Sequence, residues 1–219
     1  MSAVRERPIL FSAPMVRAIL GGSKTVTRRI VKWPAWVKDE VAAAEALRRH
    51  PALGDFQDGR TRHVFTCPFG VPGDTLWVRE TFAVLTGNGI RPVYRADGEK
   101  PVANMRWTPS IHMERRWSRL TLEVTSVRVE RLQSITEADA IAEGARRFDD
   151  IPDPHPYGEG PRWSMESPTS TDQCLRTPQF AFASLWNSIS DDATDWYANP
   201  WVWCVSFKRI ESAEARRAG

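Results

Sequence analysis

The chain has 219 residues, a length typical of one large domain or of one domain that carries insertions. Hydrophobic residues make up 42% and charged residues 26%, which is ordinary for a globular chain and argues against wholesale disorder. No stretch approaches the roughly 18 apolar residues of a membrane span, and the N-terminus lacks the apolar centre of a signal peptide. Cys67, Cys174 and Cys204 are widely spaced, which argues against a disulfide framework, so we expect a cytoplasmic protein without a membrane partner.

The charge balance is mildly basic, with 30 Lys and Arg against 27 Asp and Glu and a formal net charge of +3. That balance falls short of the concentrated positive charge of an obligate duplex-DNA binder. Because nearly all of the basic residues are arginines, each lysine carries more information. The 10 tryptophans fit two uses, as packing residues of a core or as the wall of a pocket that stacks on a base.

The first 30 residues predict strand, helix, turn and strand in that order. Residues 8–11 are a short apolar strand, and Ser12 is a good N-cap for a helix over 12–20. Gly21 and Gly22 end that helix, and 23–30 read as a loop that passes into a strand rich in β-branched residues. Residues 31–66 then break the pattern and are predicted to be an insertion, with a helix over 38–50 and a polar loop over 54–62.

A clear strand follows at 75–84, where Leu76, Val78 and Phe82 share one face by alternation. Glu80 falls on the same apolar face. A carboxylate there must find a partner or reach solvent. Two interpretations are open: Glu80 lines a pocket, or it forms a buried ion pair with an arginine.

The rest of the chain continues with short strands and helices and a second insertion. A strand over 120–130 changes the parity of its apolar residues, which predicts a bulge near Thr125 and Ser126. The remaining expected elements are a strand at 92–98, a capping box at 134–137 that opens a helix over 137–143, an insertion over 146–177, a helix over 178–189, a strand over 199–210 and a disordered tail over 211–219. Together these elements predict a single α+β domain over 1–219, a small β-barrel with flanking short helices and two long loop insertions.

Three segments, met in the same order, resemble an ASCH domain of the PUA-like superfamily: Gly21–Arg29, Pro72–Glu80 and Leu132–Gly144. More narrowly, the chain resembles the phage and prophage ASCH-type proteins labelled "morphogenetic", which share its Cys-Pro-Phe-Gly, Leu-Trp-Val-Arg-Glu, Tyr-Arg-Ala-Asp and Pro-Ser-Ile-His-Met stretches. The resemblance covers most of residues 8–210 apart from the two insertions. It implies a PUA-like β-barrel with a cleft that handles RNA, nucleotides or modified nucleosides.

Small bacterial members of the wider family hydrolyse N4-acetylcytidine to cytidine and a carboxylate. Other members are metal-dependent ribonucleases or bind RNA alone. The motif of the hydrolases has a lysine in the glycine turn, a threonine three residues later and a glutamate near the helix end. On this chain the motif falls on Lys24, Thr27 and Glu143. The resemblance therefore implies an N4-acetylcytidine amidohydrolase-like enzyme that needs no cofactor.

Amide hydrolysis is chemically consistent with these three residue types. A threonine hydroxyl is a nucleophile only with a base in reach, a lysine is such a base when burial lowers its pKa, and a carboxylate can orient the lysine or protonate the leaving nitrogen. Two patterns leave surface roles open. Strand alternation sets Lys24 and Thr27 on opposite faces unless Lys24 lies in the turn, and the helical wheel turns Glu143 away from the apolar stripe of its helix.

The dense polar and aromatic stretch 107–119 is the best candidate for recognition of a phosphate or a base edge, with a basic connecting loop as the alternative. The predicted substrate-binding residues are Arg28, Arg79, Glu80, Arg95, Trp107, Ser110, His112, Arg116, Trp117 and Arg119. The histidines and cysteines form no four-ligand pattern, so no metal site is expected. The expected partner is a modified nucleoside. The alternatives are RNA or single-stranded nucleic acid, bound or cleaved by a protein of phage origin, and a host protein that a phage accessory factor blocks.

Overall fold

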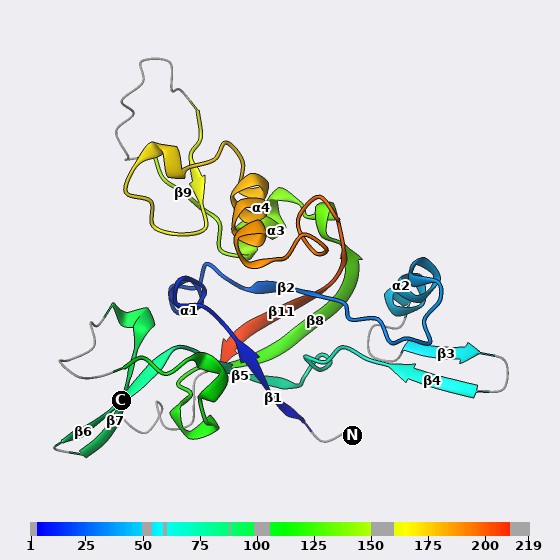
Figure 1. Cartoon of the computed structure of the whole chain (residues 1–219), viewed down its shortest axis with the longest axis horizontal. Helices are drawn as coiled ribbons and strands as arrows, with labels where there is room; N and C mark the ends of the chain where they lie inside the picture. Colours follow the sequence, from blue (N-terminus) through cyan, green and yellow to red (C-terminus); the bar gives the residue numbers. More distant parts are fainter. Residues whose placement is uncertain are drawn as a thin grey trace.

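A computed structural model describes residues 4–49, 54–58, 61–87, 89–98, 106–149 and 160–210, with the backbone alone for 54–58, 61–64 and Gly87. The chain is a mixed α and β structure (Figure 1). Its centre is a five-stranded sheet in the order β1 (Glu6–Leu10), β5 (Thr75–Arg79), β8 (Thr121–Arg131), β11 (Trp201–Ile210) and β2 (Val26–Ile30). β1 runs parallel to β5, and every other neighbouring pair is antiparallel.

The long strands β8 and β11 hold the sheet together. The register between them shifts at Ser206 and Phe207 of β11, so that Thr125 of β8 has no opposite residue, which confirms the predicted bulge. The extra residue changes which side chains face inward, and it allows both Leu122 and Val129 to be buried in the core.

Alternate residues of β11 face two separate cores. Trp203 and Val205 pack in the core that also contains α1 (Ala13–Leu20) and α2 (Glu40–Arg49). Val202 and Cys204 pack on the other face, beneath α3 (Glu137–Ala142) and α4 (Pro178–Ile189). Figure 1 shows α3 and α4 together on one side of β2 and β11.

The first insertion is more regular than predicted. The expected helix is present as α2, but the predicted polar loop over 54–62 is wrong, because β3 (Gly54–Asp58) and β4 (Thr61–Phe65) pair as a hairpin. Backbone pairing satisfies this polar segment without an apolar alternation that would reveal it. Trp33 and Phe65 pack on one another, and Phe65 packs on Trp203 of the core.

The strand predicted over 75–84 is two strands. β5 ends at Arg79, and β6 (Phe82–Gly87) leaves the main sheet to pair with β7 (Gly89–Tyr94). Between this hairpin and β8, the described residues (95–98 and 106–120) form short 3-10 turns: η1 (Arg95–Asp97), η2 (Ser110–His112) and η3 (Arg115–Trp117).

The helix predicted over 137–143 is present as α3, but its N-cap lies two residues later than predicted. The predicted capping box at 134–137 is wrong, because Leu132–Ser134 form the 3-10 turn η4 and Thr136 is the N-cap, in a capping box with Asp139. In the second insertion β9 (Arg146–Arg147) pairs with β10 (Trp163–Ser164), followed by the turn η5 (Thr171–Gln173). The predicted disordered tail over 211–219 lies outside the described residues.

The pairings among the described strands leave β1 and β2 as the two edges of the sheet and do not close it into a barrel. The predicted barrel and the single domain over 1–219 stay predictions. None of the described helices combines the length and the apolar character that crossing a bilayer requires.

Candidate functional site

The turn between α1 and β2 places Lys24 ahead of the strand. The Lys24 amide donates to the carbonyl of Ala18 at the end of α1, and the Thr25 amide donates to the carbonyl of Ala142 at the end of α3. Lys24 therefore lies in the turn and not in β2, which begins at Val26. The alternation of strand residues does not place Lys24 and Thr27 on opposite faces in this case.

A glycine lets the end of α3 sit directly on this turn. Gly144 has a φ of 112°, and a Cβ at this position would lie 3.3 Å from the Cβ of Ala18 and 3.7 Å from that of Lys24. Side chains rarely adopt this backbone conformation. The close approach brings the preceding residue, Glu143, against Lys24.

Lys24 and Glu143 form an enclosed ion pair. The Lys24 Nζ donates to Glu143 Oε2 at 2.5 Å, to the Glu143 carbonyl at 2.9 Å and to the Val26 carbonyl at 2.8 Å. These three bonds are the full donor capacity of an ammonium group. The Lys24 side chain is 0% exposed and that of Glu143 is 3% exposed, so both surface interpretations are wrong. Burial lowers the pKa of Lys24, and the Glu143 carboxylate offsets part of this effect.

Thr27 lies next to this pair. The Val26 carbonyl that accepts from Lys24 Nζ belongs to the peptide bond that leads into Thr27, so the amine is one peptide unit from the threonine. Thr27 is 1% exposed and lies opposite Val205 of β11. The structure thus brings Lys24 and Glu143 into contact, and a hydrogen bond from Lys24 to the Val26 carbonyl joins the pair to the backbone next to Thr27.

Arg28 holds the other oxygen of Glu143. Its buried guanidinium contacts Glu143 Oε1 at 3.3 Å, Glu130 Oε1 at 2.6 Å and Asp139 Oδ2 at 3.3 Å. Arg128 contacts two of these three carboxylates, Glu130 at 3.0 Å and Asp139 at 2.6 Å. Three cations thus meet three carboxylates. We call this set the β2–α3 charge network: Lys24, Arg28, Arg128, Glu130, Asp139 and Glu143.

The carboxylates of this network that belong to β8 and α3 are held ionised. Burial by itself would raise the pKa of Glu130, but hydrogen bonds from Cys204 and Arg28 outweigh it and hold the pKa below its ordinary value. Burial by itself would also raise the pKa of Asp139. The hydrogen bond from Thr136 and the charge of Arg28 outweigh this effect and lower the pKa. Charges taken out of water in this way require their partners.

One aromatic ring lies beside both Lys24 and Arg29. The centre of the Phe11 ring is 5.8 Å from Lys24 Nζ and 5.2 Å from the guanidinium of Arg29. Arg29 also donates to the Leu10 carbonyl at 2.6 Å. This bond joins the two edge strands of the main sheet, because Leu10 ends β1 and Arg29 belongs to β2.

Glu80 is in the buried ion pair that the sequence left as one of two interpretations. Arg119 contacts its two oxygens at 2.9 and 3.0 Å, and also bonds to Asp97 at 2.8 Å. The guanidinium of Arg119 lies over the Tyr94 ring at 4.0 Å. Burial raises the pKa of Glu80, and Arg119 opposes this shift.

The other predicted binding residues lie on the 3-10 turns and their neighbours. Arg79 donates to the Ile111 carbonyl and lies over Trp77, and Arg116 pairs with Glu114 while it lies over Trp117. Arg95, His112 and Arg116 are exposed, whereas Trp107, Ser110 and Trp117 are half-buried. Of the predicted binding residues, Arg28 contacts a predicted catalytic residue, Glu143, within the described part of the chain.

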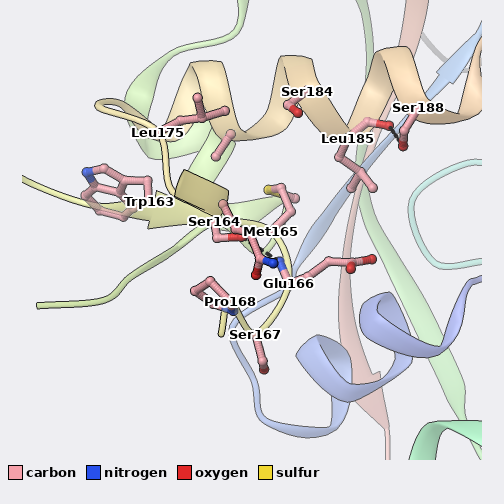
Figure 2. Close-up of a pocket in the computed structure, with 12 residues that line it drawn as sticks. Trp163, Ser164, Met165, Glu166, Ser167, Pro168, Leu175, Ser184, Leu185 and Ser188 are labelled. Atoms are coloured by element: carbon pink, nitrogen blue, oxygen red, sulfur yellow. Dashed lines mark hydrogen bonds between the residues drawn. The ribbon is translucent and has the colours of Figure 1, made fainter. Parts of the chain in front are cut away.

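Sequence reasoning missed a hollow of about 360 Å³ between α4 and the segment 163–168 (Figure 2). None of the predicted site residues lines it. β10 lines the hollow, and its partner β9 begins at Arg146, the third residue after Glu143 of the β2–α3 charge network. The hollow and the network are therefore connected by a short segment of chain. The signal that could have found it is the spacing of Ala181, Ser184 and Ser188, which places small and polar side chains on one face of α4.

Among the residues with described side chains, no group of three His, Cys, Asp or Glu is arranged to hold a metal ion. The side chains of His63 and His155 lie outside that set. No protein-family model matches the chain, and no curated protein or solved structure matches it.

Proposed function

We propose that the chain is an ASCH-type hydrolase that cleaves the N4-acyl amide of modified cytosine nucleosides, with Lys24, Thr27 and Glu143 as its catalytic residues. The observation that carries the proposal is the enclosed contact between Lys24 Nζ and Glu143 Oε2 at 2.5 Å, one peptide unit from Thr27. Burial and a neighbouring carboxylate are the conditions that give a lysine an unusual proton affinity at a reactive site.

A PUA-like barrel belongs to the same proposal. The two edge strands of the five-stranded sheet approach each other closely enough for Arg29 of β2 to donate to Leu10 of β1 at 2.6 Å. A sheet whose edges are bridged by a side chain curves toward closure, which supports the proposed barrel.

In the proposed reaction the Thr27 hydroxyl oxygen attacks the acyl carbonyl carbon, and its proton passes to the neutral amine of Lys24. The carbon–nitrogen bond then breaks, and the exocyclic nitrogen of cytosine takes the proton back from Lys24. A water molecule hydrolyses the acyl ester on Thr27, which releases a carboxylate and restores the hydroxyl.

This reaction sets two requirements on Lys24. The amine must be neutral when it accepts a proton, and the lowered pKa of this buried residue favours that state. It must also exchange one of its three hydrogen bonds for the Thr27 hydroxyl, because all three are made within the protein. Arg28 stays bonded to Glu143 Oε1 during such an exchange and acts as a positioning residue.

The test is to incubate the purified chain with N4-acetylcytidine and to follow cytidine by chromatography. Lys24→Ala, Thr27→Ala and Glu143→Gln should each lower kcat/KM at least about 100-fold, the lower range for loss of a nucleophile or an acid–base group. Matched controls are Lys208→Ala, Thr25→Ala and Glu137→Gln, because these three residues are exposed. No turnover by the unmodified chain, or full turnover by Lys24→Ala or Thr27→Ala, would remove the proposal.

A pH profile gives the same test a second readout. If the neutral amine of Lys24 is the base, kcat/KM rises with pH through the lowered pKa of this lysine and levels off before 10.5, its ordinary value. A kcat/KM that does not rise with pH below 10.5 would contradict the role of Lys24 as the base.

Binding or cleavage of RNA is a second candidate function, favoured by the exposed guanidinium of Arg116 over the Trp117 ring at 5.0 Å. Such pairs stack on unpaired bases. A gel shift with single-stranded RNA should weaken steeply with salt and with Arg116→Ala, whereas Arg209→Ala, an exposed arginine of β11, should change little. Binding that ignores salt would exclude this candidate, and cleavage that a chelator abolishes would favour a ribonuclease.

A further inference from the structure

Two arginines from different parts of the chain lie over one buried tryptophan. Trp201, the first residue of β11, is 6% exposed. The guanidinium carbon of Arg131, the last residue of β8, is 4.3 Å from the centre of the Trp201 ring, and that of Arg48 in α2 is 5.4 Å from it. Figure 1 shows α2 beside the end of β8. The two positive charges therefore lie no farther apart than these two distances together.

Backbone carbonyls hold both arginine side chains in place. Arg48 Nε donates to the Val129 carbonyl at 3.1 Å, and Arg131 Nη1 donates to the Asn199 carbonyl at 3.1 Å. Asn199 has a φ of 48°, and its side-chain oxygen accepts from the Gln133 amide at 2.9 Å. One nitrogen of each guanidinium is used in these bonds. The other two nitrogens of each have no further hydrogen-bond partner among the described residues.

The protein does not neutralise these two charges. Within the described part of the chain, no carboxylate pairs with Arg48 or Arg131. Glu45, on the preceding turn of α2, contacts Arg49 instead, at 3.9 Å. By contrast, each arginine of the β2–α3 charge network contacts at least two carboxylates. Two like charges held at one ring repel each other, and a bound anion removes that repulsion.

The indole N–H of Trp201 is a further donor at this place. Trp201 Nε1 is buried, and it makes no hydrogen bond to any described residue. Buried donors in proteins are nearly always paired, so an unpaired one requires an explanation. An anion bound at the edge of the ring accepts from this donor as well as from the two guanidinium groups, which gives the unpaired donor and the unpaired charges one common explanation.

A phosphate group matches these donors better than a carboxylate does. Guanidinium groups bind both anions through paired hydrogen bonds. A phosphate monoester carries a charge of about −1.5 to −2 at pH 7 and three acceptor oxygens, whereas a carboxylate carries a single charge on two oxygens. Two guanidinium groups without carboxylate partners therefore balance one phosphate.

We propose that Arg48, Arg131 and the edge of Trp201 form a binding site for a phosphate group, either the free anion or a small monoester. The first insertion completes this site, because its helix α2 supplies Arg48. None of Lys24, Thr27 and Glu143 takes part, so the site does not depend on the proposed hydrolase.

Titration calorimetry of the full chain with inorganic phosphate at low salt tests the site. Arg48→Met and Arg131→Met should each weaken binding at least about 10-fold, because each removes charge-assisted hydrogen bonds. Arg48→Lys should lose less, since it keeps the charge without the planar fork. Arg49→Met is the matched control, an exposed arginine of the same helix that pairs with Glu45, and it should bind phosphate normally.

Nuclear magnetic resonance gives a readout at the ring itself. Phosphate should shift the indole N–H signal that is missing from the Trp201→Phe variant, and acetate at the same concentration should not. Phenyl phosphate is the second ligand. Tighter binding of phenyl phosphate assigns the site to a monoester, and tighter binding of inorganic phosphate assigns it to the free anion.

Unchanged phosphate affinity in Arg48→Met, or an indole signal that phosphate does not move, would overturn the proposal. Arg48 is exposed, so its replacement tests the site even if Arg131→Met does not fold. Binding of single-stranded RNA that requires Arg48, in a chain that binds neither inorganic phosphate nor phenyl phosphate, would assign the arginines to a nucleic acid and would also overturn it. Hydrolysis of N4-acetylcytidine should be unchanged in Arg48→Met, which separates this test from that of the proposed function.

Discussion

Lys24 Nζ lies 2.5 Å from Glu143 Oε2 although 119 positions separate the two residues in the chain. Both side chains are enclosed, and the pair joins the turn after α1 to the end of α3. A buried pair of this kind does not have to add stability in itself, but removal of one partner leaves an uncompensated charge in the interior. The pair therefore makes two remote segments depend on each other.

Lys24→Met should lower the free energy of unfolding by about 3 kcal/mol, because the buried Glu143 carboxylate loses one of its two cationic partners and keeps only Arg28. The double variant Lys24→Met, Glu143→Leu should be more stable than the sum of the two single effects predicts. Urea unfolding at pH 7 measures both. The surface pair of exposed Lys208 and half-buried Glu123 is the control, and its removal should change stability by about 0–1 kcal/mol. Additive effects at the buried pair would contradict this coupling.

Arg28 should be replaceable by lysine at a lower cost than by methionine. The guanidinium reaches carboxylates from β8, α3 and the end of α3, and a lysine retains the charge but not the planar fork. Arg28→Met should cost about 3–5 kcal/mol of stability and Arg28→Lys clearly less. Thermal and urea unfolding measure the difference, with Arg209→Met as the exposed control. Equal losses in the two variants would show that packing, and not charge, is what Arg28 supplies.

The lowered pKa values of Glu130 and Asp139 predict acid sensitivity. A carboxyl whose pKa is lower in the folded than in the unfolded chain stabilises the fold above its unfolded value, about 3.9 for Asp and 4.3 for Glu. This stabilisation is lost as the pH falls from about 4 through the lower folded values. Unfolding in urea between pH 7 and pH 3 should show this loss, and Asp139→Asn should show a shallower slope below pH 4. An unchanged slope in that variant would contradict the ionised network.

Gly144→Ala should destabilise the chain by about 1–3 kcal/mol, because the backbone has a φ of 112° and the new Cβ would meet Ala18 at 3.3 Å. Gly98→Ala is the matched control, since Gly98 also has a positive φ, of 75°, but open space at its Cβ position. The melting temperature of each variant is the measurement. A smaller loss at Gly144 than at Gly98 would mean that the contact between α1 and the end of α3 is not tight.

The three cysteines should differ in reactivity toward a thiol reagent. Burial raises the pKa of Cys67 to about 12 and also raises that of Cys204, so that neither forms appreciable thiolate at pH 8. Cys174 is half-buried and should react first in the folded protein. Colorimetric thiol titration should therefore find one accessible thiol before unfolding, and none in Cys174→Ser. Fast labelling of Cys67 in the folded chain would contradict its burial.

Predictions from the sequence succeeded where the signal is local. The helices α2 and α4 follow from apolar spacing and flanking residues, and the bulge at Thr125 follows from a change of parity within one strand. The hairpin of β3 and β4 was missed because its pairing leaves no apolar alternation in the sequence. The cap of α3 was misplaced because η4 occupies the residues before Thr136.

The residue types of the proposed site were readable from the sequence, but their environment was not. A helical wheel relates Glu143 to the apolar stripe of its own helix, and it does not show that the turn after α1 covers the other side. Likewise nothing in the spacing of Arg28 indicates that Glu130 and Asp139, from two other elements, surround its guanidinium.

By itself, the sequence determined the local elements and the order of the motif residues, among which the resemblance to the hydrolase motif singled out Lys24. The tertiary structure alone decided that Lys24 is enclosed, that Glu143 faces it and that a hollow forms against α4. The physical reason is that secondary structure depends on neighbours along the chain. Burial and charge pairing depend instead on segments more than 100 residues apart, which only the packing of the sheet and its helices brings together.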